Sequence, residues 1–83
     1  MTRSSLAEVG PGCRIRIASL DVDGEVAAWL AAVGLHEGEV LVVLRRAVLG
    51  GPIHVRTGSG GEFAIARDLA TSIAIDRLAE AAE

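Results

Sequence analysis

The sequence contains no lysine and no tyrosine, and its 83 residues include one tryptophan and one phenylalanine. The absence of lysine excludes a phosphate-binding P-loop and Schiff-base chemistry. The eight basic residues are therefore all arginine, and eleven acidic residues bring the formal net charge to −3. Nucleic-acid-binding modules need a basic stripe and usually aromatic stacking platforms. We therefore expect no nucleic-acid partner.

Cysteine and long apolar runs are equally scarce. Cys13 is the single cysteine and cannot form an internal disulfide, which favours a reducing compartment. The longest apolar stretch, VAAWLAAVGL, has ten residues, whereas a membrane-spanning helix needs about 20. No apolar run follows Arg3, so no secretory signal is visible. The expectation is a soluble, cytoplasmic protein that does not insert into a membrane.

Five short segments have the pattern of β-strands. In the first, Cys13, Ile15 and Ile17 alternate with two arginines, as in a strand buried on one face. The second, VLVVLRR, is continuously apolar before its arginines, which is typical of a strand buried on both faces. The third and fourth alternate again and are joined by the glycine-rich turn GSGG. The segments are 13–20, 40–46, 53–57, 62–66 and 73–75.

A helix is predicted between the first two strands, within residues 21–39. Its apolar residues Val26, Trp29, Leu30 and Val33 fall on one helical face. Gly34 follows them at the position where a left-handed residue usually ends a helix, and the next residue is expected to pack back on the last turn. We expect Trp29 to lie in the core; its alternative role is that of a partly exposed interface anchor.

These elements predict a mainly β fold, a small closed or nearly closed barrel with an aliphatic core. Hydrophobic residues make up 51% of the chain, and a chain of this length forms one domain, here residues 1–83. Closing the sheet removes exposed strand edges. The helix is expected to plug one open end of the barrel. We place the barrel at about residues 5–76 and a tail or short helix at 77–83.

Four stretches, in this order, give the sequence a family resemblance: SLAEVGPGCRIRIASL, LAAVGL, HEGEVLVVLRRAVLGGPIHVR and FAIARDLATSIAI. They resemble the FeoA family, small cytoplasmic proteins associated with ferrous iron transport. The resemblance implies an SH3-like barrel of five strands with a helix between the first two. It also implies a non-enzymatic accessory role and association with FeoB, a membrane protein that imports Fe(II) and carries a cytoplasmic GTP-binding domain.

The chain departs from the family pattern at three places. The helical segment EVAAWL lacks the basic residues that the family usually carries there. Glu37 stands where the family has a proline, and Arg67 alone stands where the family has two arginines. If those basic residues contact an acidic or phosphate-bearing partner, this chain lacks part of that surface.

The connection between the second and third strands, AVLGGP at 47–52, has two interpretations. Either its apolar residues cap the barrel core, or they form an apolar tip that a partner binds, with glycines and a proline fixing its shape. A second copy of the chain, in a weak homo-oligomer, is one such partner. The predicted partner-binding residues are Val48, Leu49, Gly50, Gly51, Pro52, Leu35, Arg45 and Arg46.

Metal-binding and catalytic signals are weak. His36, Glu37 and His54 are the candidate metal ligands, and they lack the spacing of a known metal motif. We expect no required cofactor; a sensor or carrier that binds Fe(II), or adventitious Zn(II), directly is the alternative function. Cys13 is expected to be buried and inert. No nucleophile stands with a base and an orienting acid, so no enzymatic activity is expected.

Overall fold

Six strands, two α-helices and one 3-10 turn make up the computed structural model, which describes residues 4–78. The strands are β1 (Ser4–Ser5), β2 (Arg14–Leu20), β3 (Val40–Arg46), β4 (Ile53–Thr57), β5 (Glu62–Ile65) and β6 (Ile73–Arg77). The helical elements are η1 (Leu6–Glu8), α1 (Gly24–Ala32) and α2 (Arg67–Thr71).

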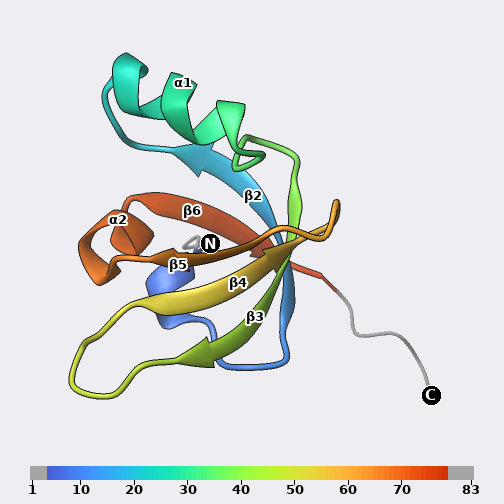
Figure 1. Cartoon of the computed structure of the whole chain (residues 1–83), viewed down its shortest axis with the longest axis vertical. Coiled ribbons are helices and arrows are strands. Elements are labelled where there is room, and N and C mark those ends of the chain that lie inside the picture. The colour runs from blue at the N-terminus through green and yellow to red at the C-terminus, as the bar shows by residue number, and fades with distance from the viewer. Residues whose placement is uncertain (1–3, 79–83) are drawn as a thin grey trace.

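The strands form one antiparallel sheet in the order β1-β6-β2-β3-β4-β5 (Figure 1). Register shifts in β2 between Ile17 and Ser19, and in β3 between Val43 and Arg45, mark bulges. Bulges bend a strand and increase its twist, which lets a short sheet curl on itself. The result is the expected SH3-like barrel, with the helix α1 between β2 and β3.

The core is aliphatic, as expected. One face of each long strand is buried: Ile15 and Ile17 on β2, for example, lie inside while Arg14 and Arg16 are exposed. Phe63 packs against the edge of this cluster. The buried residues are Leu6, Val9, Ile15, Ile17, Leu30, Leu35, Leu41, Val43, Ile53, Val55, Ile65, Ala70, Ile73 and Ile75.

The helix α1 does not plug the barrel as predicted. Its side chains Trp29 and Val26 are 65% and 37% exposed, and Leu30, in the last turn, is its buried residue. The helix ends as predicted: Gly34 has a φ of 99° and donates to Ala31, while Leu35 N–H donates to the Leu30 carbonyl. This Schellman motif folds Leu35 back against Leu30. The barrel therefore holds the end of the helix, and the rest projects from it (Figure 1).

Three further expectations need correction. The strand β3 is buried on one face rather than two, since Val42 and Leu44 are only partly buried. Its β-branched residues reflect strand propensity. Within the described residues no helix covers its outer face, because α2 packs against η1 and β6. The sheet has a sixth strand, β1, whose two serines are too few to show an alternation. The strand β6 runs to Arg77, so no helix begins there; the rest of the predicted tail, 79–83, lies outside the described residues.

Candidate docking site

The turn between β3 and β4, residues 47–52, is an exposed apolar projection, which we call the tip. Val48 is 81% exposed and Leu49 is 101% exposed, so neither side chain touches the core. The interpretation in which these residues cap the barrel is therefore wrong. Large aliphatic side chains that lie fully in water gain nothing for the fold, and such patches often mark contact sites.

The backbone of the tip is strained at Leu49. Its φ of 59° makes it the one non-glycine residue within 4–78 that lies in the left-handed region, and Gly50 follows with a φ of 74°. A side chain in this region costs about 1–2 kcal/mol. Strained residues that persist commonly lie at functional positions. The strain at Leu49 is therefore a cost to stability that the exposed side chain does not offset by packing on the core.

Leu49→Asn is expected to raise the free energy of unfolding by about 1 kcal/mol, because asparagine tolerates the left-handed region better than leucine does. Val48→Asn is the control, since the φ of Val48 is not positive, and it should leave stability unchanged. Urea unfolding followed by circular dichroism measures both. A lower midpoint for Leu49→Asn would mean that the leucine side chain stabilises the fold.

The shape of the tip is fixed by crowding and hydrogen bonds around Gly51. A Cβ on Gly51 would lie 2.7 Å from the Cβ of Ala47, so no other residue fits without movement. Gly51 N–H donates to the Val48 carbonyl at 3.1 Å, and Ala47 N–H donates to the Pro52 carbonyl at 3.0 Å. These contacts fix the backbone that carries the two apolar side chains.

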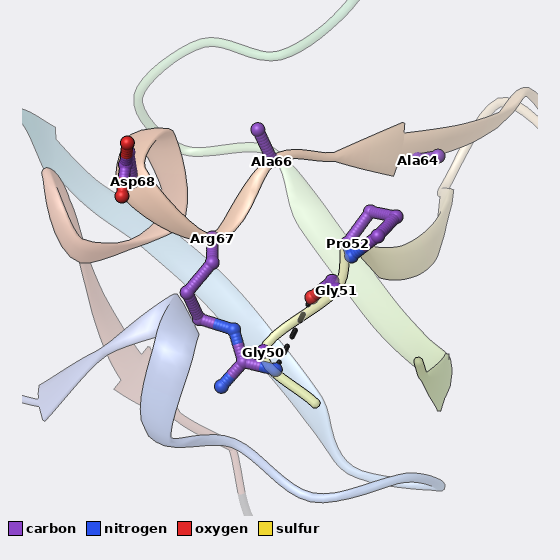
Figure 2. A pocket seen from close by; sticks show the side chains of 7 residues that line it. All are labelled: Gly50, Gly51, Pro52, Ala64, Ala66, Arg67 and Asp68. Atoms are coloured by element: carbon purple, nitrogen blue, oxygen red, sulfur yellow. Dashed lines mark hydrogen bonds between the residues drawn. The ribbon is translucent and has the colours of Figure 1, made fainter. Parts of the chain in front are cut away.

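A shallow hollow of about 430 Å³ lies beside the tip (Figure 2). From α2, Arg67 reaches under the tip and donates through Nη2 to the Gly51 carbonyl at 3.2 Å. Its Nε is buried and has no hydrogen-bond partner among residues 4–78. The hollow is lined by Gly50, Gly51, Pro52, Ala64, Ala66, Arg67 and Asp68.

Sequence reasoning missed this hollow. In the sequence Arg67 is only the single arginine of a family motif, and nothing there indicates its hydrogen bond to Gly51 of the tip. The sequence feature that could have indicated the hollow is the pair Ala64 and Ala66. These small residues alternate with Ile65, and on the outer face of a strand they leave space for a neighbouring group.

The remaining predicted partner residues do not all lie at the tip. Arg45 is exposed at the end of β3, beside the tip, and Arg46 is partly buried and donates through Nη1 to the Val9 carbonyl at 2.9 Å. Leu35 is 2% exposed and is therefore not available to a partner. Its prediction as a partner residue is wrong because the fold-back against the last turn of α1 buries it. The helix and the tip lie at opposite ends of the molecule (Figure 1).

The structure places the candidate metal ligands in separate environments. Exposed His36 donates through Nδ1 to the Glu37 carbonyl at 2.9 Å, and its Nε2 lies 3.9 Å from Oε1 of Glu39. His54 is on β4, partly buried, opposite Arg45 and Ala64. Within the described ranges no three His, Cys, Asp or Glu residues converge as a metal site would require. Metal binding stays a prediction.

Cys13 precedes β2 as a free, half-buried thiol that packs against the core. It is thus less enclosed than predicted.

Neither helix between residues 4 and 78 is long and apolar enough to cross a bilayer.

The structure is an SH3-like barrel with an exposed apolar turn, the build of a small accessory domain. The FeoA domain model matches residues 4–77 of the chain. The chain therefore belongs to the FeoA family, which is linked to ferrous iron transport and is a family of small accessory domains.

Solved structures agree with this assignment. A FeoA protein from Chlorobium tepidum is 33% identical, with a TM-score of 0.82 over 90% of this chain and 70% of that one. Iron(II) transport protein A from Clostridium thermocellum is 28% identical, with a TM-score of 0.80 over 89% of this chain and 45% of that one. No curated protein sequence matches significantly.

The same fold occurs inside longer proteins. A manganese-dependent transcriptional repressor in complex with manganese superposes with a TM-score of 0.82 at 24% identity. The match covers 94% of this chain but 38% of the repressor. At this identity the likeness concerns the fold alone.

Proposed function

We propose that this chain is a non-enzymatic accessory protein of ferrous iron uptake that acts in the cytoplasm. It docks through the tip on the cytoplasmic GTP-binding region of a FeoB-type membrane transporter and modulates transport or assembly. The observation that carries the proposal is the full exposure of Val48 and Leu49 on a backbone held in a strained conformation. The family assignment supplies the iron-uptake context.

The tip has the physical properties of a docking element. Burying two aliphatic side chains that are already exposed removes apolar surface from water, at about 25 cal/mol per Å². Because Gly51 and its hydrogen bonds already fix the backbone, little conformational entropy is lost on binding. Arg45 next to the tip can pair with an acidic residue at the rim of the interface, which favours the correct orientation.

The hollow beside the tip extends the proposed surface. A partner side chain of moderate size fits beside Ala64 and Ala66, while the tip contacts the partner on the other side. The Arg67 guanidinium donates one hydrogen bond, from Nη2, to the Gly51 carbonyl, so its role in this arrangement is to support the tip. We therefore assign recognition to the apolar side chains and positioning to the arginine.

The double substitution Val48→Asp/Leu49→Asp tests the proposal. We expect its affinity for the purified cytoplasmic domain of the transporter to fall more than about tenfold, since the loss of one hot-spot residue costs about 2 kcal/mol or more and about 1.4 kcal/mol is a factor of ten. Both positions are exposed, so the thermal midpoint should stay close to that of the unmodified chain. Calorimetric titration measures the affinity.

The control is Trp29→Asp, which places one aspartate on the exposed apolar helix at the other end of the molecule. It should bind the transporter domain as the unmodified chain does. An affinity that the tip substitutions leave unchanged, or one that Trp29→Asp alone abolishes, contradicts docking through the tip.

A further inference from the structure

Charge is unevenly distributed along this chain. Residues 17–44, which include α1, contain five acidic residues and no arginine. Residues 45–56, the hairpin that carries the tip, contain three arginines and no acidic residue. The acidic residues of the first segment are Asp21, Asp23, Glu25, Glu37 and Glu39, and the arginines of the second are Arg45, Arg46 and Arg56.

Four of the five acidic residues are exposed around α1; the fifth, Glu39, accepts a hydrogen bond from Gly58 N–H. Near the tip, Asp68 is the acidic residue that lines the hollow, and Figure 2 shows it directed away from the Arg67 guanidinium. Arg45 is exposed beside the tip. One end of the molecule is thus acidic, and the other has a basic rim.

Each end also carries an exposed apolar surface. On α1 it is Trp29 with Val26, flanked by the small exposed residues Ala28, Ala31 and Ala32, which leave the helix accessible to close approach. At the other end it is the tip, with Val48 and Leu49. Figure 1 shows α1 at the top of the molecule and the tip at the lower left, so one molecule cannot cover both surfaces itself.

We propose that the exposed face of α1 is the docking site for the tip of a second copy of this chain. Leu49 of one molecule packs against Trp29 of the next, and the basic rim of the tip faces the acidic residues around the helix. Tryptophan is the side chain most enriched at the energetic centre of interfaces. Because both contacts use the tip, this self-association competes with the transporter interaction proposed above.

Charge decides in favour of a head-to-tail contact. A helix-to-helix contact would bring two acidic rims together, and a tip-to-tip contact would bring two exposed Arg45 side chains together, both of which are repulsive. Helix-to-tip contact pairs opposite charges. Because a head-to-tail pair still has one free helix and one free tip, association continues beyond a dimer unless the molecules close into a ring. The assembly should therefore grow with concentration and weaken as salt screens the charges.

The test uses two variants, Trp29→Asp, which keeps the tip, and Leu49→Asp, which keeps the helix. Both side chains are largely exposed, so both variants should fold, which circular dichroism checks. In sedimentation velocity at high protein concentration, the unmodified chain is expected to associate and each variant alone to remain monomeric. An equimolar mixture should form a complex that stops at two molecules, because the second helix and the second tip carry the substitutions.

Fluorescence gives an independent signal, since Trp29 is the single tryptophan. In the mixture only the Leu49→Asp copy emits, and its emission should shift to the blue when Trp29→Asp is added. Self-association of either variant, or a mixture without a complex, overturns the head-to-tail arrangement, and an unmodified chain that is monomeric at millimolar concentration overturns the proposal altogether. Transporter binding is measured at concentrations where the chain is monomeric, so the two proposals fail separately.

Discussion

Leu41→Ala is expected to remove a large share of the free energy of unfolding, about 2–5 kcal/mol. Leu41 is fully buried near the start of β3, between Ile15 on β2 and Thr57 on β4. Removing a buried leucine side chain costs about 2–5 kcal/mol, because the transfer free energy is lost and a cavity remains. A small domain has a total free energy of unfolding of about 5–15 kcal/mol, and a chain this short belongs to the lower part of that range.

Urea unfolding should be followed by far-ultraviolet circular dichroism, because the exposed Trp29 reports little on the core. The matched control is Leu44→Ala, the same change in the same strand at a partly buried position. It should cost about 1 kcal/mol or less, in line with the smaller area it buries. Equal losses for the two variants would contradict the one-sided burial of β3.

Gly51→Ala is expected to lower the free energy of unfolding by about 1–3 kcal/mol, the usual cost of inserting a methyl group into a packed site. The new Cβ would lie 2.7 Å from the Cβ of Ala47 and 3.3 Å from the carbonyl oxygen of Val48. The turn must shift to relieve these contacts, which moves Val48 and Leu49 together. Affinity for the proposed transporter partner should therefore fall as well.

Two further variants make this result specific. Gly10→Ala is the control, because nothing lies within 4 Å of a Cβ at that position, and it should change stability little. Ala47→Gly combined with Gly51→Ala removes the shorter of the two contacts, so we expect it to recover part of the lost stability and binding, as a double-mutant cycle would measure. The absence of recovery would mean that the crowding does not set the shape of the tip.

The barrel could be predicted because its signals are local. The alternation of apolar and polar residues in β2 and β4 indicates which face of each strand is buried, and Gly34 indicates where the helix ends. The exposure of Trp29 could not be predicted, because periodicity identifies a common face but not how much of it meets the barrel. In a nine-residue helix attached at its last turn, Leu30 and Val33 reach the core while Trp29 remains largely in water.

The candidate site depends on contacts between distant residues. Arg67 reaches Gly51 across 16 positions of sequence, and the crowding of Gly51 by Ala47 depends on the backbone path of the turn. The sequence offers two glycines and a proline there, which indicate a fixed turn. Whether its apolar residues point inward or outward follows from the completed barrel, and for that reason the sequence allows both interpretations.

The pairing of β1 with β6 has an architectural implication. Ser4 lies opposite Ile75 and Ser5 opposite Ala74, in antiparallel register, so the chain enters and leaves the barrel at adjoining points on the same side. A domain with this geometry can be inserted into a larger polypeptide, or fused to one end of it, without separating any of its strands. The repressor that contains the same barrel in 38% of its length illustrates such reuse.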